Sequence, residues 1–505
     1  MKSETPSYVL ELPLKTTSVQ ETIILTRLEA GRQLYNACLG EALKRLDLIR
    51  QSREFQKVIV LPEGVERTDK FKNLNKENGF TEYALHDYVA KIRDSWIEEH
   101  INSHIAQKIA TRAFKAVQKK AFRKAKNVRF KGKNQFDTLE GKNNCTGLIF
   151  RDNTLFWSGL EIPCIIDENN KVIAYGLKPE HRIKYCRVVR RKINSKNRFY
   201  IQLILEGKPY QDPEKKIGTE EIGLDVGPST IAIVGDTKAE LKQFCSELMP
   251  KQIEKRKLQR KLDRQRRANN PQNYNENGTV KKGKKKWKKS NHYKKISSEI
   301  AEIDRKLAAH RKSLHGRDQN DIIAIGTTIK AENIPYRSFQ KMWGKSVSIR
   351  APSMFMSGLK RKAENAGGSF NNFPTNTTKL SQVCHICGNT VKKPLSQRWH
   401  VCCGIKMQRD LYSAFLSKCV DVSTGALDIA RARLLWPGLE PVLSEAMSRA
   451  YQSANGRKTV PASFGLYGNQ RQSGSSVKSE ATITEAVDDV IRDRINEDES
   501  HREVI

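Results

Sequence analysis

The sequence lacks two features of exported and membrane-bound proteins. It has no run of apolar residues long enough to cross a lipid bilayer, and its first residues do not form a secretory signal peptide. The cysteines also lack the spread-out pattern of a disulfide framework, because six of the ten occur singly and four cluster within twenty residues. These absences favour a cytoplasmic, intracellular protein whose thiols stay reduced.

Acidic residues are the other deficit. The chain of 505 residues has 56 Asp and Glu against 91 Lys and Arg, a formal net charge of +35. A surplus of this size favours a nucleic-acid partner, since each neutralised phosphate releases counterions and adds affinity. The alternative is a soluble protein that is merely basic. The length predicts about two to four domains.

Two segments concentrate the positive charge. Residues 111–134 contain ten Lys or Arg and no acid, and residues 251–300, inside a predicted basic helical region over 250–315, carry a local net charge of +14. A solvated basic helix face is the alternative for the first segment, but so many like charges would repel one another without a polyanion nearby. The nucleic-acid contacts that we predict are Arg112, Lys115, Lys119, Lys120, Arg123, Lys124, Arg256, Arg260, Arg264, Arg267, Lys285, Lys286 and Lys288.

The N-terminal half alternates between strand and helix patterns. Residues 8–14 predict a strand, and residues 20–50 and 81–126 predict helices. Short β-rich runs between 145 and 206, "KVIAYGL" (171–177) among them, predict a small barrel or sandwich. We expect the first strand to join this β structure, with the helical block inserted between.

The C-terminal half is expected to mix strands and helices. Residues 220–236 predict two strands joined by a tight turn at Gly227-Pro228, and residues 321–335 predict a further strand. The stretch at 271–283 is expected to be a flexible loop. Helices are expected at 354–367, 411–420 and 440–452, and the Gly-, Ser- and acid-rich tail over 455–505 is expected to be disordered.

Three acids stand at the edges of these predicted elements. Asp225 and Glu332 end apolar strands, and Asp410 begins a helix. Taken singly, an Asp before a turn is an ordinary turn-former, and an acid at a helix start is favoured by the macrodipole. Taken together, carboxylates from separate elements can hold two Mg²⁺ ions for cleavage of a phosphodiester bond. We therefore predict that the three acids are catalytic and bind the metal ions.

The cysteine cluster predicts a second metal site. Cys384 and Cys387 have CxxC spacing, and "HVCCG" follows after a hairpin-length interval, which is typical of a zinc ribbon. Buried free thiols are the alternative. We predict Cys384, Cys387 and Cys403 as Zn²⁺ ligands and leave the fourth ligand open between His400 and Cys402, because adjacent side chains on an extended backbone point apart.

The order of these motifs resembles one family. The chain contains, in this order, "GLDVGPSTIAIV", the acid in "KAEN", the cysteine pairs and "RDLYSAF". This order resembles the split RuvC nuclease with an embedded zinc ribbon that is found in TnpB proteins, which are transposon-encoded RNA-guided endonucleases. The miniature type V CRISPR effectors, which descend from TnpB proteins, share this arrangement. The resemblance covers residues 220–420. In three respects the chain departs from it: Gln408 stands where the family has an acid, the second cysteine pair is compressed to adjacent residues, and the stretch after about residue 421 is longer than a minimal family member needs.

The resemblance implies a multidomain α+β fold. An RNase H-like (RuvC) α/β core with an inserted zinc ribbon would follow a β-barrel-like wedge domain that carries an inserted helical recognition domain. The expected domains are 1–20 with 127–215 (wedge), 21–126 (recognition), 216–375 with 408–422 (RuvC nuclease, including the basic segment 250–315), 376–407 (zinc ribbon), 423–454 (helical extension) and 455–505 (tail).

The resemblance also implies the partners and the reaction. The protein would be an RNA-guided DNA endonuclease that uses two Mg²⁺ ions and works at the nucleoid. Its partners would be a guide RNA and a single- or double-stranded DNA target, and the guide RNA would recognise the target by base pairing. Two alternatives stay open. One is a DNA-strand transferase or resolvase of the RNase H-like class, and the other is a guide-dependent DNA-binding repressor whose cleavage is weak or lost.

Overall fold

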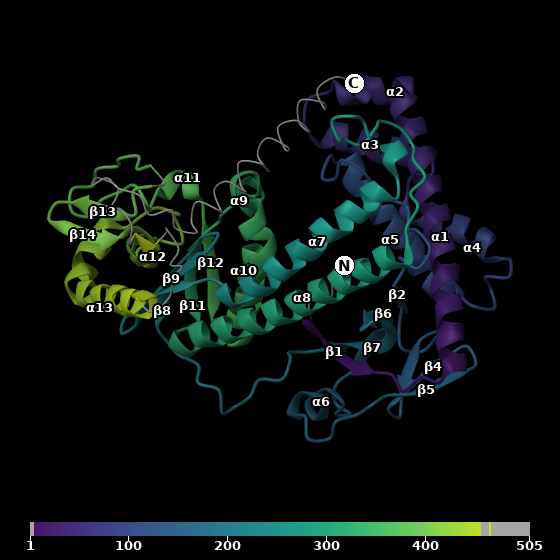
Figure 1. Ribbon diagram of the computed structural model, residues 1–505, viewed down its shortest axis with the longest axis horizontal. Coiled ribbons are helices and arrows are strands. Elements are labelled where there is room, and N and C mark those ends of the chain that lie inside the picture. Colours follow the sequence, from purple (N-terminus) through teal and green to yellow (C-terminus); the bar gives the residue numbers. More distant parts are fainter. Residues whose placement is uncertain (1–4, 395, 456–463, 466–505) are drawn as a thin grey trace. The chain divides into compact units, whose positions relative to one another are not determined.

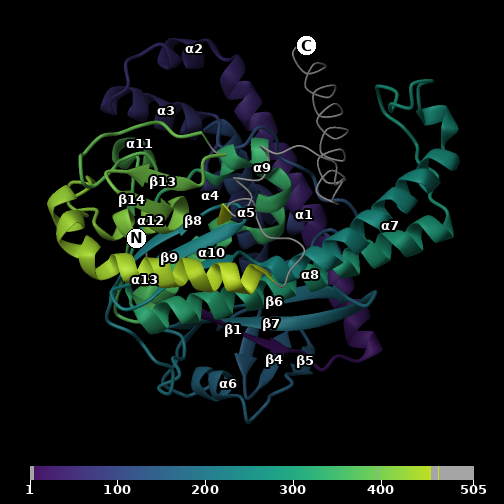
Figure 2. The ribbon, with the colours of Figure 1, turned by 60° about the vertical axis from the view of Figure 1, so that its left-hand side comes forward.

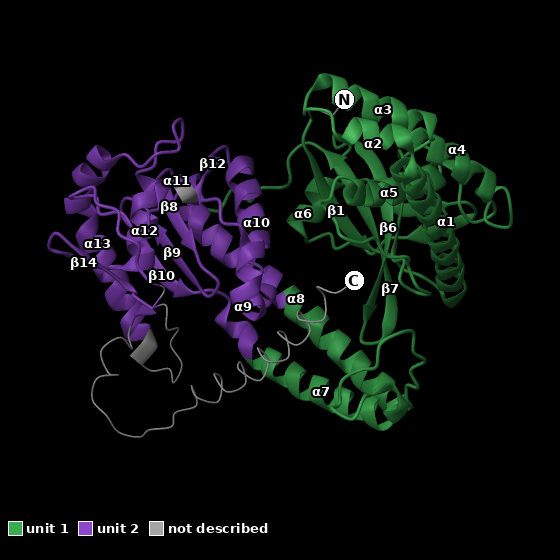
Figure 3. Ribbon diagram, turned by 90° about the horizontal axis from the view of Figure 1, so that it is seen from above, with its two compact units in different colours: residues 1–215, 250–309 green, residues 216–249, 310–505 purple. Residues whose placement is uncertain are grey.

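The chain folds into two compact units in the computed structural model, which describes residues 5–394, 396–455 and 464–465. One unit comprises residues 1–215 and 250–309, and the other comprises residues 216–249 and 310–505 (Figure 3). The disordered tail predicted over 455–505 lies outside the described residues except at 455, 464 and 465. Each helix in the described part of the chain is too short or too polar to span a bilayer.

The first unit packs helices against a four-stranded sheet of order β1-β7-β6-β2. The N-terminal strand pairs antiparallel with β7, so the prediction that it joins the later β structure is confirmed. A second sheet has the order β3-β4-β5. The strands are β1 (Ser7–Pro13), β2 (Thr138–Glu140), β3 (Ile149–Arg151), β4 (Thr154–Trp157), β5 (Leu160–Pro163), β6 (Ile183–Ile193) and β7 (Lys196–Glu206) (Figure 1).

The helices of this unit begin at side-chain caps. Thr17 and Gln20 form a capping box at the start of α1, and Asn102 caps α5, whose apolar face contributes Ile105, Ile109 and Phe114 to the core. The predicted block over 81–126 is broken into two helices, and α2 and α3 were not predicted. The bounds are α1 (Ser18–Gln51), α2 (Arg53–Ile59), α3 (Val65–Glu77), α4 (Glu82–Arg93), α5 (Ser103–Ala121) and α6 (Lys171–Gly176).

The strand prediction for residues 171–177 is wrong, because most of this segment is helix α6. The Asn170 side chain accepts hydrogen bonds from the backbone N–H groups of Val172 and Ile173, which begins a helical turn. A cap at the right position therefore outweighs the β propensity of Val172 and Ile173.

A basic helical hairpin contributes residues 250–309 to the first unit, and the rest of its second helix belongs to the second unit. Helix α7 (Met249–Ala268) lies beside α8 (Asn291–Ile325), as Figures 1 and 2 show, and Lys255 Nζ lies 2.6 Å from Asp304 Oδ1. The loop between them is folded and not the flexible segment that was predicted. Asn270 and Asn273 donate side-chain hydrogen bonds to the carbonyls of Lys288 and Lys286, and residues 271–273 form the short 3₁₀ helix η2.

The second unit contains a five-stranded mixed sheet of order β10-β9-β8-β11-β12. Strands β8, β9 and β10 are antiparallel neighbours, whereas β11 runs parallel to both β8 and β12. The predicted strand over 321–335 begins later than expected, because α8 continues to Ile325. The strands are β8 (Glu221–Val226), β9 (Thr230–Val234), β10 (Ala239–Gln243), β11 (Thr328–Glu332) and β12 (Ser369–Phe373).

Helix α12 covers this sheet and shares its core. Its buried residues Leu411, Phe415 and Leu416 pack with Ala232 and Val234 of β9. A two-stranded hairpin of β13 (Trp399–Cys402) and β14 (Ile405–Gln408) leads directly into it. The remaining elements are η1 (Ser246–Leu248), α9 (Tyr336–Arg350), α10 (Pro352–Asn365), α11 (Thr375–Thr378), α12 (Arg409–Lys418) and α13 (Ile429–Asn455).

Candidate functional site

The three predicted acids lie at neighbouring ends of secondary-structure elements in the second unit. Asp225 is near the end of β8, Glu332 is the last residue of β11, and Asp410 is in the first turn of α12. The parallel register pairs Ala331 with Leu224, so the next step sets Glu332 beside Asp225. The hydroxyl Oγ1 of Thr230 donates to Asp410 Oδ2 at 3.2 Å and thereby ties the helix acid to β9.

The acids interact electrostatically at this corner. Burial raises the pKa of Asp225 well above its usual range, and the negative charges of Asp410 and Glu332 raise it further. Burial raises the pKa of Asp410 as well, although nearby Arg398 and hydrogen bonds from Gln408 and Thr230 oppose the shift. The like charges at this corner disfavour ionisation of Asp225, and carboxylate oxygens of this kind suit a divalent cation such as Mg²⁺.

The burial of Glu332 predicts that the stability of the metal-free protein depends on pH. Burial raises the pKa of the Glu332 carboxyl from 4.5 to about 7, although the Leu380 N–H partly opposes this. The folded state therefore holds a proton that the unfolded state has already released, so we expect the free energy of unfolding to fall as pH rises from 4.5 to about 7. Urea titrations of chelator-treated protein at both ends of this window measure the fall, which Glu332→Gln should reduce; an equal fall in both proteins would contradict the prediction.

Gln408, which departs from the motif that the sequence resembles, has a structural role at the start of α12. Its side chain is fully buried, and its Oε1 accepts a hydrogen bond of 2.8 Å from the Leu411 N–H, which caps the helix. An uncharged amide meets this requirement without adding a fourth negative charge beside Asp410. The substitution is therefore compatible with a helix that presents Asp410 to the other acids.

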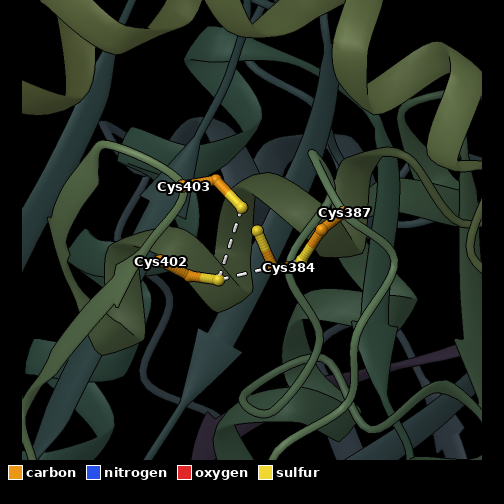
Figure 4. A group of neighbouring side chains, drawn as sticks. All are labelled: Cys384, Cys387, Cys402 and Cys403. Atoms are coloured by element: carbon orange, nitrogen blue, oxygen red, sulfur yellow. Dashed lines mark hydrogen bonds between the residues drawn. The ribbon is translucent and has the colours of Figure 1, made fainter.

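Four cysteines converge on one point of the same unit, as Figure 4 shows. The sulfur atoms of Cys384, Cys387, Cys402 and Cys403 all lie within 4.8 Å of one another. Cys402 Sγ lies 3.7 Å from Cys387 Sγ and 3.6 Å from Cys403 Sγ. Zn–S bonds of about 2.3 Å in a tetrahedron place sulfur atoms roughly 3.8 Å apart, so the four thiols fit a Zn²⁺ ion.

The backbone explains how adjacent cysteines enter one cluster. Cys403 has a φ of 50° and Gly404 a φ of 78°, so the chain turns in the left-handed region and is not extended there. The expectation that Cys402 and Cys403 point apart is therefore wrong. His400, the other candidate for the fourth ligand, lies outside the cluster: its buried ring stacks on Tyr412 at 3.9 Å between centroids and its Nδ1 is hydrogen-bonded to Lys393.

The cysteine cluster is joined to the helix that carries Asp410. The buried Tyr412 hydroxyl of α12 accepts a hydrogen bond of 3.1 Å from the backbone N–H of His385, which lies between Cys384 and Cys387. Burial lowers the pKa of His385 to about 4, and Arg433 adds to this effect. Neutral His385 packs against Tyr412 and Trp436. The cluster thus supports the N-terminal turn of α12.

A basic cleft of about 810 Å³ lies in the first unit, between α5, the following segment and the β6–β7 sheet. The predicted contacts Arg112, Lys115 and Lys119 line it, whereas Lys120, Arg123 and Lys124 do not. Arg129, Lys131 and Arg187 also line it and were not singled out from the sequence. The Arg112 guanidinium lies 4.9 Å from the centroid of the Phe136 ring, so charge and an aromatic surface occur together in the cleft.

The other predicted contacts lie on the helical hairpin. Arg256, Arg260, Arg264 and Arg267 follow one another along α7 at helical spacing, and the exposed pair Arg260 and Arg264 faces solvent. Arg267 instead serves the loop, because its side chain donates to Asp263 Oδ2 and to the Gly278 carbonyl. In the loop itself, Lys286 and Lys288 are exposed and Lys285 is half-buried.

Comparisons with known proteins find distant likenesses to solved structures. No protein-family model matches the chain, and no curated protein sequence matches it. The chain is similar to the protein in "Cryo-EM structure of the Cas12f1-sgRNA-target DNA complex", with a TM-score of 0.42, 13% identity and coverage of 82% of this chain and 99% of that one. A second likeness, to "Cryo-EM structure of CRISPR-Cas12f Ternary Complex", has a TM-score of 0.23, 14% identity and coverage of 78% and 81%. Both scores are low, so neither likeness identifies a family or an activity for this chain.

Proposed function

We propose that this protein is an RNA-guided DNA endonuclease that cleaves phosphodiester bonds with two Mg²⁺ ions. The observation that carries the proposal is the meeting of Asp225, Glu332 and Asp410 at the ends of β8, β11 and α12, where the charges of Glu332 and Asp410 raise the pKa of Asp225. Three carboxylates gathered in a half-buried corner are suited to divalent cations. We assign the mixed sheet with α12 to the RNase H-like class that the sequence resemblance implies.

The proposed roles follow from the positions of the side chains. Asp225, Glu332 and Asp410 would hold the two ions, which when bound activate a water molecule and stabilise the leaving oxygen. Thr230 and Gln408 orient the carboxylate of Asp410, and Tyr336 donates a hydrogen bond of 3.2 Å to the Val226 carbonyl beside the site. Cys384, Cys387, Cys402 and Cys403 would hold a separate structural Zn²⁺ ion.

The proposed nucleic-acid surfaces are the cleft beside α5 and the part of α7 that exposes Arg260 and Arg264. A guide RNA and its DNA heteroduplex need long basic channels that contact the backbone and not the bases, and the net charge of +35 suits such a partner. The domain boundaries expected from the sequence, with a nuclease core over 216–375 and 408–422, remain part of this proposal.

Two measurements test the proposal against its alternatives. RNA that copurifies with the protein is sequenced, and DNA matched to its variable end is then incubated with the complex in Mg²⁺. A discrete RNA and cleavage of the matched DNA alone support the endonuclease. No bound RNA would leave a strand transferase or resolvase, and bound RNA with target binding but without cleavage would leave the repressor.

The cleft makes a prediction about salt dependence. Replacing both Lys115 and Lys119 by Gln should weaken RNA binding and make the plot of log affinity against log salt shallower by roughly 0.7–0.9 for each lost phosphate contact. Filter binding between low and moderate salt measures the slope. Lys70→Gln on α3, where the ammonium pairs with Glu66 at 2.7 Å, is the matched control and should leave the slope unchanged. Equal slopes for all three proteins would remove the cleft from the interface.

A further inference from the structure

Helix α12 and strand β8 meet through residues at matching intervals. On the helix, Asp410, Ala414 and Lys418 are four residues apart and share one face; on the strand, Asp225, Gly223 and Glu221 are two residues apart and run the opposite way. Four helical residues rise about 6 Å and two strand residues about 6.6 Å, so the two series stay in step over this length. At the outer end of the two series stand Asp410 on the helix and Asp225 on the strand.

The middle contact brings the two backbones together. A Cβ atom built on Gly223 would lie 1.9 Å from the Ala414 carbonyl oxygen and 2.6 Å from the Lys418 backbone nitrogen, far inside ordinary contact distance. Both neighbours are backbone atoms, so neither can turn aside as a flexible side chain would. Glycine at this position therefore sets how closely α12 approaches the strand that carries Asp225.

The innermost contact anchors the C-terminal end of α12. The Lys418 side chain is only 1% exposed, and its Nζ donates to the Glu221 carbonyl and lies within 2.6 Å of Asp236 Oδ1. A buried ammonium is retained only where its hydrogen bonds and charge are satisfied, and here the satisfying groups belong to the start of β8 and to the segment after β9. The anchor lies at the opposite end of the helix from Asp410.

A second buried lysine joins this anchor to the strand of Glu332. Lys330 on β11 precedes Glu332 by two residues, so both side chains lie on the same face of the sheet. Its Nζ donates to the Lys418 and Val420 carbonyls at 3.1 and 2.7 Å and lies 2.6 Å from Glu221 Oε1. A cation at these terminal carbonyls also suits the negative end of the helix dipole.

We infer that Gly223, Lys418 and Lys330 are positioning residues, which hold α12 at the distance and register where Asp410 meets Asp225 and Glu332 to form the metal site. The inference rests on the proposed function, since it concerns the same carboxylates. None of the three residues touches a reacting group. Each acts through the placement of α12.

Gly223→Ala tests the inference, with Gly316→Ala as the matched control. A Cβ at Gly316 on α8 meets nothing within 4 Å. Calorimetric titration of the RNA-free protein with Mn²⁺ reports on the carboxylates without any need for cleavage. We expect Gly223→Ala to bind Mn²⁺ at least about tenfold more weakly and to cut matched DNA about 100-fold more slowly, because a displacement of about 1 Å is enough for such a loss. Gly316→Ala should behave as the wild type.

Lys418→Met provides a second test if Gly223→Ala fails to fold. Methionine has a similar length, and the partner Asp236 is 51% exposed at its side chain and stays hydrated when the ammonium is removed. Circular dichroism and zinc content establish folding, and Mn²⁺ affinity should again fall about tenfold. If Gly223→Ala or Lys418→Met folds and still binds Mn²⁺ with wild-type affinity, the positioning inference is wrong but the proposed function is unaffected. A wild-type protein that neither binds Mn²⁺ nor cuts DNA overturns the proposed function itself.

Discussion

Asp225→Asn and Glu332→Gln are each expected to lower Mg²⁺-dependent cutting of matched DNA by at least about 10³-fold, because each change removes a metal ligand that is worth several kcal/mol in the transition state. Binding of the matched DNA should stay within a few-fold of the wild type, since the loss of a negative charge also reduces repulsion towards phosphate. Single-turnover cleavage and a gel-shift titration measure the two quantities separately.

Glu440→Gln on α13 is the matched control for this first prediction. Its carboxylate is exposed and belongs to the same unit, so the variant makes the same chemical change away from the three acids. It should cut and bind as the wild type does. Wild-type cutting by Asp225→Asn and Glu332→Gln would show that the three acids are not the active site.

Cys384→Ser is expected to lose the zinc ion and, with it, cutting. The sulfur atom of Cys384 is one of the four in the cluster, and the neighbouring His385 N–H is hydrogen-bonded to Tyr412 of α12. Binding of a structural zinc ion contributes about 10–16 kcal/mol to small domains, so its loss should loosen the hairpin that leads into Asp410. Zinc per chain, measured by atomic emission, should fall from about one equivalent to a small fraction of this value.

Cys145→Ser controls for the loss of a thiol. Cys145 is exposed, lies in the other unit and is not a member of the cluster. This variant should keep its zinc and its activity. A full equivalent of zinc in Cys384→Ser would exclude the four-cysteine site, and a zinc-free variant that still cuts would separate the cluster from α12.

The local pattern of the sequence was sufficient for many elements. The strand-turn-strand at Asp225 and the helix that begins near Asp410 were predicted, because apolar spacing and turn residues act over a few positions. The same local logic missed α6, where a single Asn170 cap overrides the residue preferences of the segment. Local patterns also single out Gly227 at the turn and not Gly223, which lies at the backbone contact with α12.

The sequence by itself determined the kinds of chemistry available: carboxylates for hard cations, a cysteine pair with metal-binding spacing, and a large positive charge for a polyanion. These follow from residue type and short-range spacing. Only the tertiary structure decided that Cys402 and not His400 joins the cysteine cluster, because the left-handed backbone at Cys403 brings two adjacent thiols together. The packing of α12 on β8 and β11 was likewise decided only by the tertiary structure. It depends on long-range contacts such as the one between Lys418 and Glu221, two residues that are 197 positions apart in the sequence.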